Sequence, residues 1–403
     1  MKKIILSVAF LGMMISANAQ CGSVGAGMRA LTQDKIAEAK TLFEKAGQEI
    51  KAAEAKKEEL DAKCYARYYY GSGAAVLQEY QTQPALDLVS KISLLNKSEG
   101  FFTQFFELDY EDKSYRAKAI TDLEAVANRQ KEVAYDYFQS GDYETAFGLF
   151  EKCLLNKSKL GVAHLDLHAY KSASITASRI GEYDKALKYN EALIQNPTLK
   201  VGPEVNKQDK NLTRKAELLG SLGRTEEALK VLDSAKVLFP ENSGIELQQL
   251  RIFMDANDND GAIDVLESLT KKITDRDDLF LIMGQIYSER GETEKSYEAY
   301  KQALSVNAES INALYGMGAY YVNKSNEYVQ NLNNVGSSES DNAAKANIIV
   351  ERNKNFDKAI HYFDMLLLVD PKDRSTLNAL KKIYETKEDK VKVEEINQKL
   401  MAD

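Results

Sequence analysis

Hydrophobic and polar residues follow one another along most of this chain with the spacing of amphipathic helices, arranged in pairs around short turns. One turn pattern occurs four times, with a glycine five residues before an alanine or serine. The four copies span residues 141–146, 181–186, 223–228 and 291–296. No stretch alternates hydrophobic and polar residues between turn residues as a strand does. The pattern therefore predicts an all-α protein.

Most copies continue with further marker residues. A large apolar residue comes four positions after the small one, and another small residue three positions later, as in Phe150 and Cys153, Leu232 and Ala235, and Tyr300 and Ala303. The preceding helix also carries small residues, namely Ala134, Ala216, Gly284 and Gly318. Small residues allow two helices to approach closely, and the large residue fills the space between them. The turn glycine adopts a left-handed conformation, and Pro197, Pro240 or Pro371 ends a unit.

The copies have a fixed period in the middle of the chain. Ala262 lies 34 residues after Ala228 and 34 residues before Ser296. A helix–turn–helix unit of this length, with these small and large positions, resembles the tetratricopeptide repeat family. The resemblance implies a right-handed superhelical solenoid of antiparallel helix pairs, whose first helices line a concave groove.

The repeat pattern, together with the N-terminal sequence described below, divides the chain into segments. We expect a signal peptide over 1–19, a flexible N-terminus over 20–33, irregular N-terminal helical repeats over 34–126, repeat-like pairs over 127–198, three regular units over 209–310, a further unit over 311–371, and capping helices over 372–403. The unit over 311–371 contains an insertion of about 29 residues relative to the period, roughly at 325–352. We interpret this insertion as extended helices joined by a flexible polar loop.

The stretch DANDNDGAIDVLE, residues 255–267, has the composition of a calcium loop. The period assigns it another role, because Asn257 takes the place of the turn glycine. Asp258 and Asp260 then lie at a helix start, where acidic residues cap free amides. Ala256 would occupy the first position of a calcium loop, which needs a carboxylate. The period therefore predicts a turn without a metal.

The N-terminus has the features of a secretory signal peptide. Two lysines precede an apolar run over 4–15, and Ala17-Asn18-Ala19 forms a cleavage site, so we expect cleavage after Ala19 and a periplasmic or secreted protein. An alternative is a lipoprotein modified at Cys21, although that processing requires a small residue where Gln20 stands. The apolar run over 4–15 is too short to span a bilayer as a helix, and no other segment approaches about 18 consecutive apolar residues, so we expect no direct membrane insertion after cleavage.

Charge and cysteine content limit the possible partners. The formal net charge is −8, and loss of Lys2 and Lys3 with the signal peptide takes it to −10. An acidic chain without a basic block argues against nucleic acid and against an anionic membrane surface. Three cysteines allow at most one intramolecular disulfide, and Cys153 lies at a helix-packing position, where it serves as a small buried hydrophobe.

The sequence contains no recognisable motif of a catalytic or cofactor site. The histidines are His164, His168 and His361, and the first two lack an evident third metal ligand. The glycine-rich stretch 21–27 lacks the lysine of a phosphate-binding loop. We therefore predict no metal, no cofactor and no enzymatic activity.

The family register suggests where a partner would bind. The groove positions include Lys210, Arg214, Glu217, Arg251, Gln285 and Tyr315. Some family members bind carboxylates through a cationic clamp, and here Lys131, Lys210 and Arg214 fall at its cationic positions. Tyr135 and Ser172 replace the two asparagines of that clamp, so we do not expect the clamp function.

Three functions remain open at this point. We favour a non-enzymatic scaffold of the bacterial cell envelope that binds a protein or peptide partner. An alternative is an accessory factor for outer-membrane assembly or secretion. A third is a glycan-binding repeat protein, although such proteins usually use tryptophan and this chain has none. Its 22 tyrosines are interpreted mainly as helix packing, with a tyrosine-lined groove as the alternative. The oligomeric state is left open.

Overall fold

The computed structural model describes residues 21–56, 58, 60–108, 110, 112–163, 166–196, 208–333, 335–336 and 339–401. This part of the chain contains 18 helices and no strand. The predicted all-α class, a solenoid of helix pairs, is confirmed. The signal peptide with its cleavage after Ala19, and the residues His164 and Pro197, lie outside the described residues.

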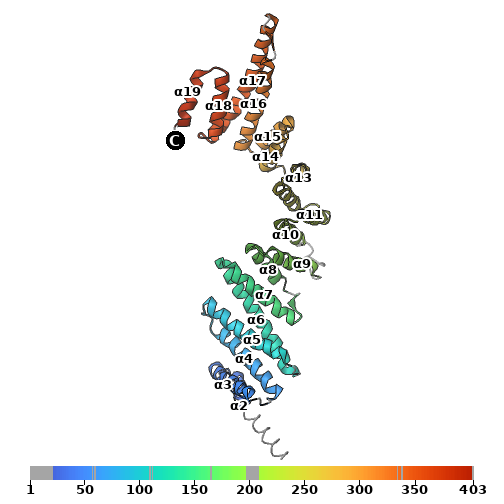
Figure 1. Cartoon of the computed structure of the whole chain (residues 1–403), viewed down its shortest axis with the longest axis vertical. Helices are drawn as coiled ribbons and strands as arrows, with labels where there is room; N and C mark the ends of the chain where they lie inside the picture. The colour runs from blue at the N-terminus through green and yellow to red at the C-terminus, as the bar shows by residue number, and fades with distance from the viewer. Residues whose placement is uncertain are drawn as a thin grey trace, which may run out of the picture. The chain divides into compact units, whose positions relative to one another are not determined.

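The helices form two compact units, the first ending at Arg224 and the second beginning at Thr225. The first unit contains α2 (Gly22–Thr32), α3 (Ile36–Ala55), α4 (Ala62–Thr82), α5 (Leu88–Glu107), α6 (Lys113–Ser140), α7 (Tyr143–Lys159), α8 (Leu167–Arg179), α9 (Tyr183–Gln195) and α10 (Gln208–Ser221). In this unit each helix packs against the next one in sequence (Figure 1). Packing mainly between sequence neighbours, with further contacts of α4 with α2 and α6, is the architecture of a solenoid.

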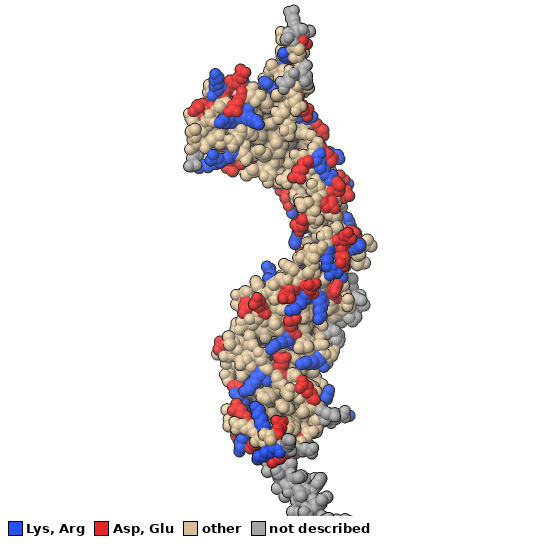
Figure 2. All heavy atoms as spheres, viewed as in Figure 1, with Lys and Arg blue, Asp and Glu red and all other residues tan. Residues whose placement is uncertain are grey.

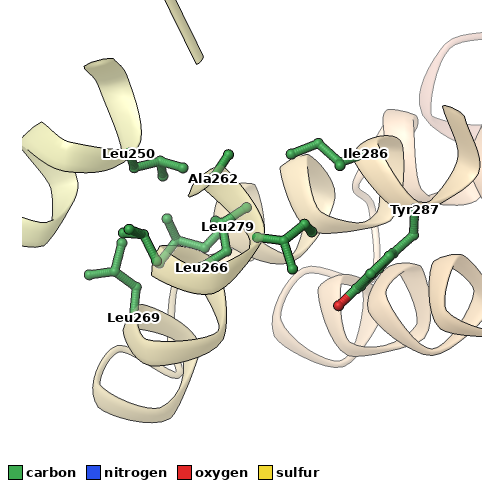
Figure 3. Packing of buried hydrophobic residues seen from close by; sticks show 9 residues of the cluster. Leu250, Ala262, Leu266, Leu269, Leu279, Ile286 and Tyr287 are labelled. Atoms are coloured by element: carbon green, nitrogen blue, oxygen red, sulfur yellow. The ribbon is translucent and has the colours of Figure 1, made fainter. Parts of the chain in front are cut away.

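The second unit follows the same rule. It contains α11 (Thr225–Leu238), α12 (Ser243–Asp255), α13 (Asn259–Lys272), α14 (Asp277–Glu289), α15 (Thr293–Val306), α16 (Ile311–Asn333), α17 (Glu339–Val369), α18 (Arg374–Thr386) and α19 (Lys390–Met401). Side chains of α12, α13 and α14 meet in a shared interior that includes Leu250, Leu266, Leu269 and Leu279 (Figure 3). Leu266 and Leu269 are completely buried there.

The turns between helices have the conformation that the sequence pattern predicts. Gly141, Gly181, Gly223 and Gly291 have φ values of +88°, +80°, +72° and +72°. Asn257 has a φ of +54°, so it replaces the turn glycine. In the same turn, the Asp258 carboxylate accepts a hydrogen bond from the Gly261 amide at 3.0 Å and caps α13. Asp260 forms an ion pair with Arg290. The acidic stretch is thus accounted for by capping and pairing.

Small residues bring paired helices together, as the pattern predicts. Ala262 and Ala303 have no exposed surface. A side-chain carbon added at Gly284 would lie 2.7 Å from the Tyr300 ring, closer than real carbon contacts. The ring of Tyr300 therefore needs the bare backbone of α14 beside it.

The N-terminal segment differs from the sequence prediction. We expected residues 20–33 to be flexible, but residues 22–32 form helix α2, with Val24 and Leu31 buried. Cys21 forms a disulfide with Cys64, which attaches α2 to the start of α4. The expectation was wrong because it treated the glycines as a source of flexibility. Gly27 instead lets the Phe43 ring of α3 pack closely against α2.

The insertion in the second unit lengthens two paired helices. It occupies the C-terminal part of α16 and the N-terminal part of α17. The buried Ser325 hydroxyl donates a hydrogen bond to the Arg352 carbonyl at 3.0 Å, which joins the two extensions. Residues 334, 337 and 338 between them are outside the described residues.

A buried carboxylate joins three helices of the second unit. The Glu246 side chain on α12 is 1% exposed and accepts hydrogen bonds from Lys236 of α11 and from Lys272 and Ser268 of α13, each at 2.7 Å. Burial alone would raise the pKa of Glu246, but these three donors lower it to about 2. The carboxylate is therefore charged in the folded protein over the whole physiological range.

We predict that Gly284→Val destabilises the second unit by about 1–3 kcal/mol, because the added carbons overlap the Tyr300 ring. The midpoint of urea unfolding, followed by circular dichroism, measures the change. Gly148→Ala is the control, since Gly148 lies within α7 with open space around it and alanine favours helix. Equal stability of wild type and Gly284→Val would contradict the packing argument.

We predict that Glu246→Gln lowers the free energy of unfolding by about 2 kcal/mol at pH 7, because charged hydrogen bonds are lost. The folded-state pKa is below the usual 4.5, so the stabilisation is complete above that value and declines as the pH falls toward 2. Urea unfolding between pH 7 and pH 2 should show the wild type converging on the variant. A difference that does not depend on pH would argue against a charged Glu246.

Candidate functional site

The predicted groove residues are divided between the two units. Lys210, Arg214 and Glu217 are on α10 of the first unit, whereas Arg251, Gln285 and Tyr315 are on α12, α14 and α16 of the second. A single groove made of all six residues remains a prediction.

Arg214 is engaged inside the first unit. Its guanidinium donates hydrogen bonds to the carbonyl and the hydroxyl oxygen of Ser174 on α8, at 3.3 and 3.4 Å. Ser174 is completely buried, and burial lowers the pKa of Arg214. Arg214 thus attaches α10 to α8. Lys210, on the same helix, has an exposed side chain.

Lys131, at another of the cationic clamp positions, also bonds within the protein. The Lys131 ammonium of α6 donates to the Asp166 carboxylate at 2.7 Å, and Lys157 of α7 pairs with the same carboxylate. Asp166 also caps α8 by accepting from the Ala169 amide at 3.0 Å. Burial acts to raise the pKa of Asp166, but the two lysines and the amide bring it below its usual value.

The two positions that differ from the clamp are paired with each other. The hydroxyl groups of Tyr135 and Ser172 lie 3.0 Å apart and share a hydrogen bond. The arrangement around Lys131, Tyr135 and Ser172 is therefore an internal polar joint between α6, α7 and α8.

The groove residues of the second unit face solvent. Arg251 and Gln285 are exposed, on the first helices of two consecutive pairs. Tyr315 on α16 is 38% exposed, and its ring centroid is 5.7 Å from that of Phe363 on α17. These three side chains are accessible to a partner, in contrast to Arg214.

Other tyrosines of the second unit mainly pack against one another. The ring centroids of Tyr297 and Tyr320 are 4.7 Å apart, and the rings of Tyr321 and Tyr362 stack at 5.9 Å. Burial and a hydrogen bond to Glu294 raise the pKa of Tyr320 to about 12. These side chains link α15, α16 and α17, which supports the packing interpretation for them.

Sequence reasoning missed a cavity in the first unit. It lies between α3, α4 and α5 and has a volume of about 50 Å³. Its walls include Phe43, Tyr68 and Phe101, with Ser72 of α4 among them. The signal for it was the segment YYYGSGAAV, where Ser72 lies between two glycines in an aromatic helix.

The structure offers no metal cluster or membrane-spanning helix in its described part. No three His, Cys, Asp or Glu side chains converge there. No helix among the described residues is long and apolar enough to cross a bilayer. Cys153 is completely buried, and burial raises the pKa of its thiol to about 11, so it is a packing residue as predicted. Acidic and basic side chains are mixed on the face shown in Figure 2.

These features define an α-helical repeat protein built from helix–turn–helix units. A family model identifies residues 278–310 as a tetratricopeptide repeat, which supports the predicted family. That match covers α14 and α15, where Gly284 and Tyr300 pack together. A search of curated proteins found no match.

Solved structures with similar helical architecture include three repeat proteins. A MamA protein is 18% identical, with 52% of this chain and 94% of that chain covered and a TM-score of 0.36. YrrB, described as a TPR protein with an unusual peptide-binding site, is 19% identical, with 49% and 95% covered and a TM-score of 0.36. A TPR repeats protein from Bacteroides fragilis NCTC 9343 is 18% identical, with 64% and 98% covered and a TM-score of 0.30.

We predict that Arg214→Glu loosens α10, because a carboxylate would face the Ser174 carbonyl in place of a donor. Hydrogen exchange of the α10 amides should become about 10-fold faster, the equivalent of 1.4 kcal/mol of local stability. Lys210→Glu, on the same helix with an exposed side chain, should leave this exchange unchanged. Equal protection in both variants would show that Arg214 does not hold α10.

Proposed function

We propose that this chain is a non-enzymatic scaffold that binds a protein or peptide partner along the first helices of its repeats. The observation that carries the proposal is the contrast within each helix pair of the second unit. Small and large apolar residues are buried between the helices, while Arg251, Gln285 and Tyr315 remain exposed on α12, α14 and α16. Side chains of this kind, with arginine and tyrosine among them, are enriched where proteins bind one another.

We further propose that the protein acts in the bacterial cell envelope, as a periplasmic or secreted protein. The signal-like sequence over 1–19 supports export. The Cys21–Cys64 disulfide supports it independently, since disulfides persist in oxidising compartments. The same bond favours a soluble exported form over a lipoprotein, because the Cys21 sulfur cannot be in a disulfide and a lipid thioether together.

The test is capture of the partner by crosslinking in the native cell envelope. We predict that the wild type captures one abundant partner and that Arg251→Glu with Tyr315→Ala reduces its yield at least about 10-fold, because exposed arginine and tyrosine anchors often contribute more than 1 kcal/mol each. Because Tyr315 is 38% exposed and its ring lies beside that of Phe363, urea unfolding of the variant is measured first to show that the second unit stays folded.

Lys271→Glu is the matched control, because Lys271 is also exposed but lies on the second helix α13. It should capture the partner as the wild type does. A partner retained by the double variant would place the binding surface elsewhere. Absence of any specific partner in all three samples would overturn the scaffold function. The identity of a captured protein would decide whether the scaffold serves outer-membrane assembly or secretion.

A further inference from the structure

The Cys21–Cys64 disulfide joins the first helices of two successive pairs. Helix α2 pairs with α3, α4 pairs with α5, and α2 also contacts α4 (Figure 1). Cys21 immediately precedes α2, and Cys64 lies in the first turn of α4. The bond therefore attaches the first helix of one pair to the first helix of the next.

Helix α2 is intrinsically weak as a helix. It has 11 residues, three of them glycines, and an isolated helix shorter than about 12–15 residues is marginal in water. The Phe43 ring requires Gly27. A side-chain carbon at Gly22 or Gly25, in contrast, would collide with nothing. Gly22 and Gly25 thus lower the stability of the helix with no gain in packing.

The start of α2 also lacks a side-chain cap. Helices α4 to α8 each begin after an aspartate whose carboxylate accepts a hydrogen bond from a helix amide. Cys21 occupies this position in α2 and makes no such bond, and the first turn carries no acidic residue. An uncapped start lowers helix stability. The disulfide therefore fixes the start of α2 where a cap does so in the later helices.

Few noncovalent contacts hold α2 in place. Val24 packs in a buried cluster with Cys64 of α4, and Leu31 is the other large aliphatic side chain that the helix buries. The Ser23 hydroxyl adds a hydrogen bond to the Glu49 carboxylate at 2.9 Å. For an uncapped helix with two glycines that packing does not require, the covalent bond is the principal constraint.

The two cysteines of the bond differ in accessibility. Cys21 is partly exposed, whereas Cys64 is only 3% exposed. When a thiolate attacks the Cys21 sulfur, the S–S bond breaks and the Cys64 thiolate leaves and takes up a proton. The second thiol of a dithiol then displaces Cys21 from the mixed disulfide. The dithiol is oxidised to a disulfide, and the two cysteines together gain two electrons and two protons.

We propose that the Cys21–Cys64 bond is a redox-sensitive latch on α2. A dithiol–disulfide oxidoreductase in its dithiol form reduces the bond and releases α2, and the disulfide form of such an enzyme reverses the exchange and returns α2 to α3 and α4. The reduced chain keeps the pairs from α4 onward, while its first pair loses its first helix. The inference goes beyond the scaffold function and does not depend on it, because neither the latch nor its test involves a partner.

The test is thiol labelling of the folded full chain with iodoacetamide, before and after addition of excess dithiothreitol. Peptide mass spectrometry identifies each labelled cysteine. Cys64 reports release of α2, because it is buried while α2 is in place. Cys153 is the internal control, since it is a free and completely buried thiol of α7 in the same unit. We expect Cys64 of the reduced protein to be labelled at least about 10-fold faster than Cys153.

Three results would overturn the latch. A disulfide that stays intact in excess dithiothreitol without denaturant is not redox-sensitive in the folded protein. Labelling of Cys21 with Cys64 still protected means that α2 stays in place without the bond. Equal labelling of Cys64 and Cys153 means that the bond holds the whole first unit together and not α2 alone.

Glycine variants test why α2 is released. Gly22→Ala with Gly25→Ala strengthens the helix without new contacts to α3 or α4, so labelling of Cys64 in the reduced variant should slow at least about 3-fold. Gly100→Ala is the matched control, since Gly100 lies within α5 and also has open space around it. It should leave the labelling of Cys64 unchanged. An equal rate in wild type and the double variant would contradict release through weakness of the helix.

Discussion

The close approach of paired helices at small residues is the constraint on which the rest of this structure depends. An aromatic ring needs bare backbone opposite it, as Tyr300 does at Gly284 and Phe43 does at Gly27 and Gly71. This contact orients the apolar side of each helix toward its neighbour. The side chains on the opposite side of the helix therefore remain exposed and accessible to a partner. The exposed residues of α12, α14 and α16, and the space beside Ser72, both follow from where the rings sit.

Buried acids provide a second kind of joint, seen among the described residues at Asp166 in the first unit and at Glu246 in the second. Asp166 is paired with Lys131 and Lys157 and caps α8. Glu246 is paired with Lys236 and Lys272. In each case one carboxylate connects three successive helices. Since apolar contacts in a solenoid are mostly between neighbours, such a joint adds a directional link that also sets the register of the helices.

The repeat was predictable from the sequence because its markers recur at a constant period. The turn at Asn257 and the packing of Gly284 against Tyr300 follow from that period alone. The period fails in the N-terminal part, where α3 to α6 are 20 to 28 residues long rather than the 13 or 14 of α10 to α15. Helix α2 and the cavity lined by Phe43, Tyr68 and Phe101 lie in that part.

Polar contacts were the other feature that the sequence did not reveal. Arg214 occupies a groove position in the family register, yet it bonds to Ser174, a residue 40 positions earlier. Hydrogen-bond partners so far apart in sequence are brought together by helix packing, and a local sequence pattern does not predict them. Arg251, Gln285 and Tyr315 keep the exposure that a groove position implies.

The Cys21–Cys64 bond has a practical consequence for anyone who produces this protein. It closes a loop with a sequence separation of 43 residues, and a constraint of that length is worth about 4 kcal/mol in the chain-entropy model. Material made in a reducing cytosol would lack it. Helix α2 would then depend on noncovalent packing alone, and so would the Phe43 ring that α2 supports. Recombinant chain intended for ligand work should therefore be folded under oxidising conditions and carry its purification tag away from Cys21.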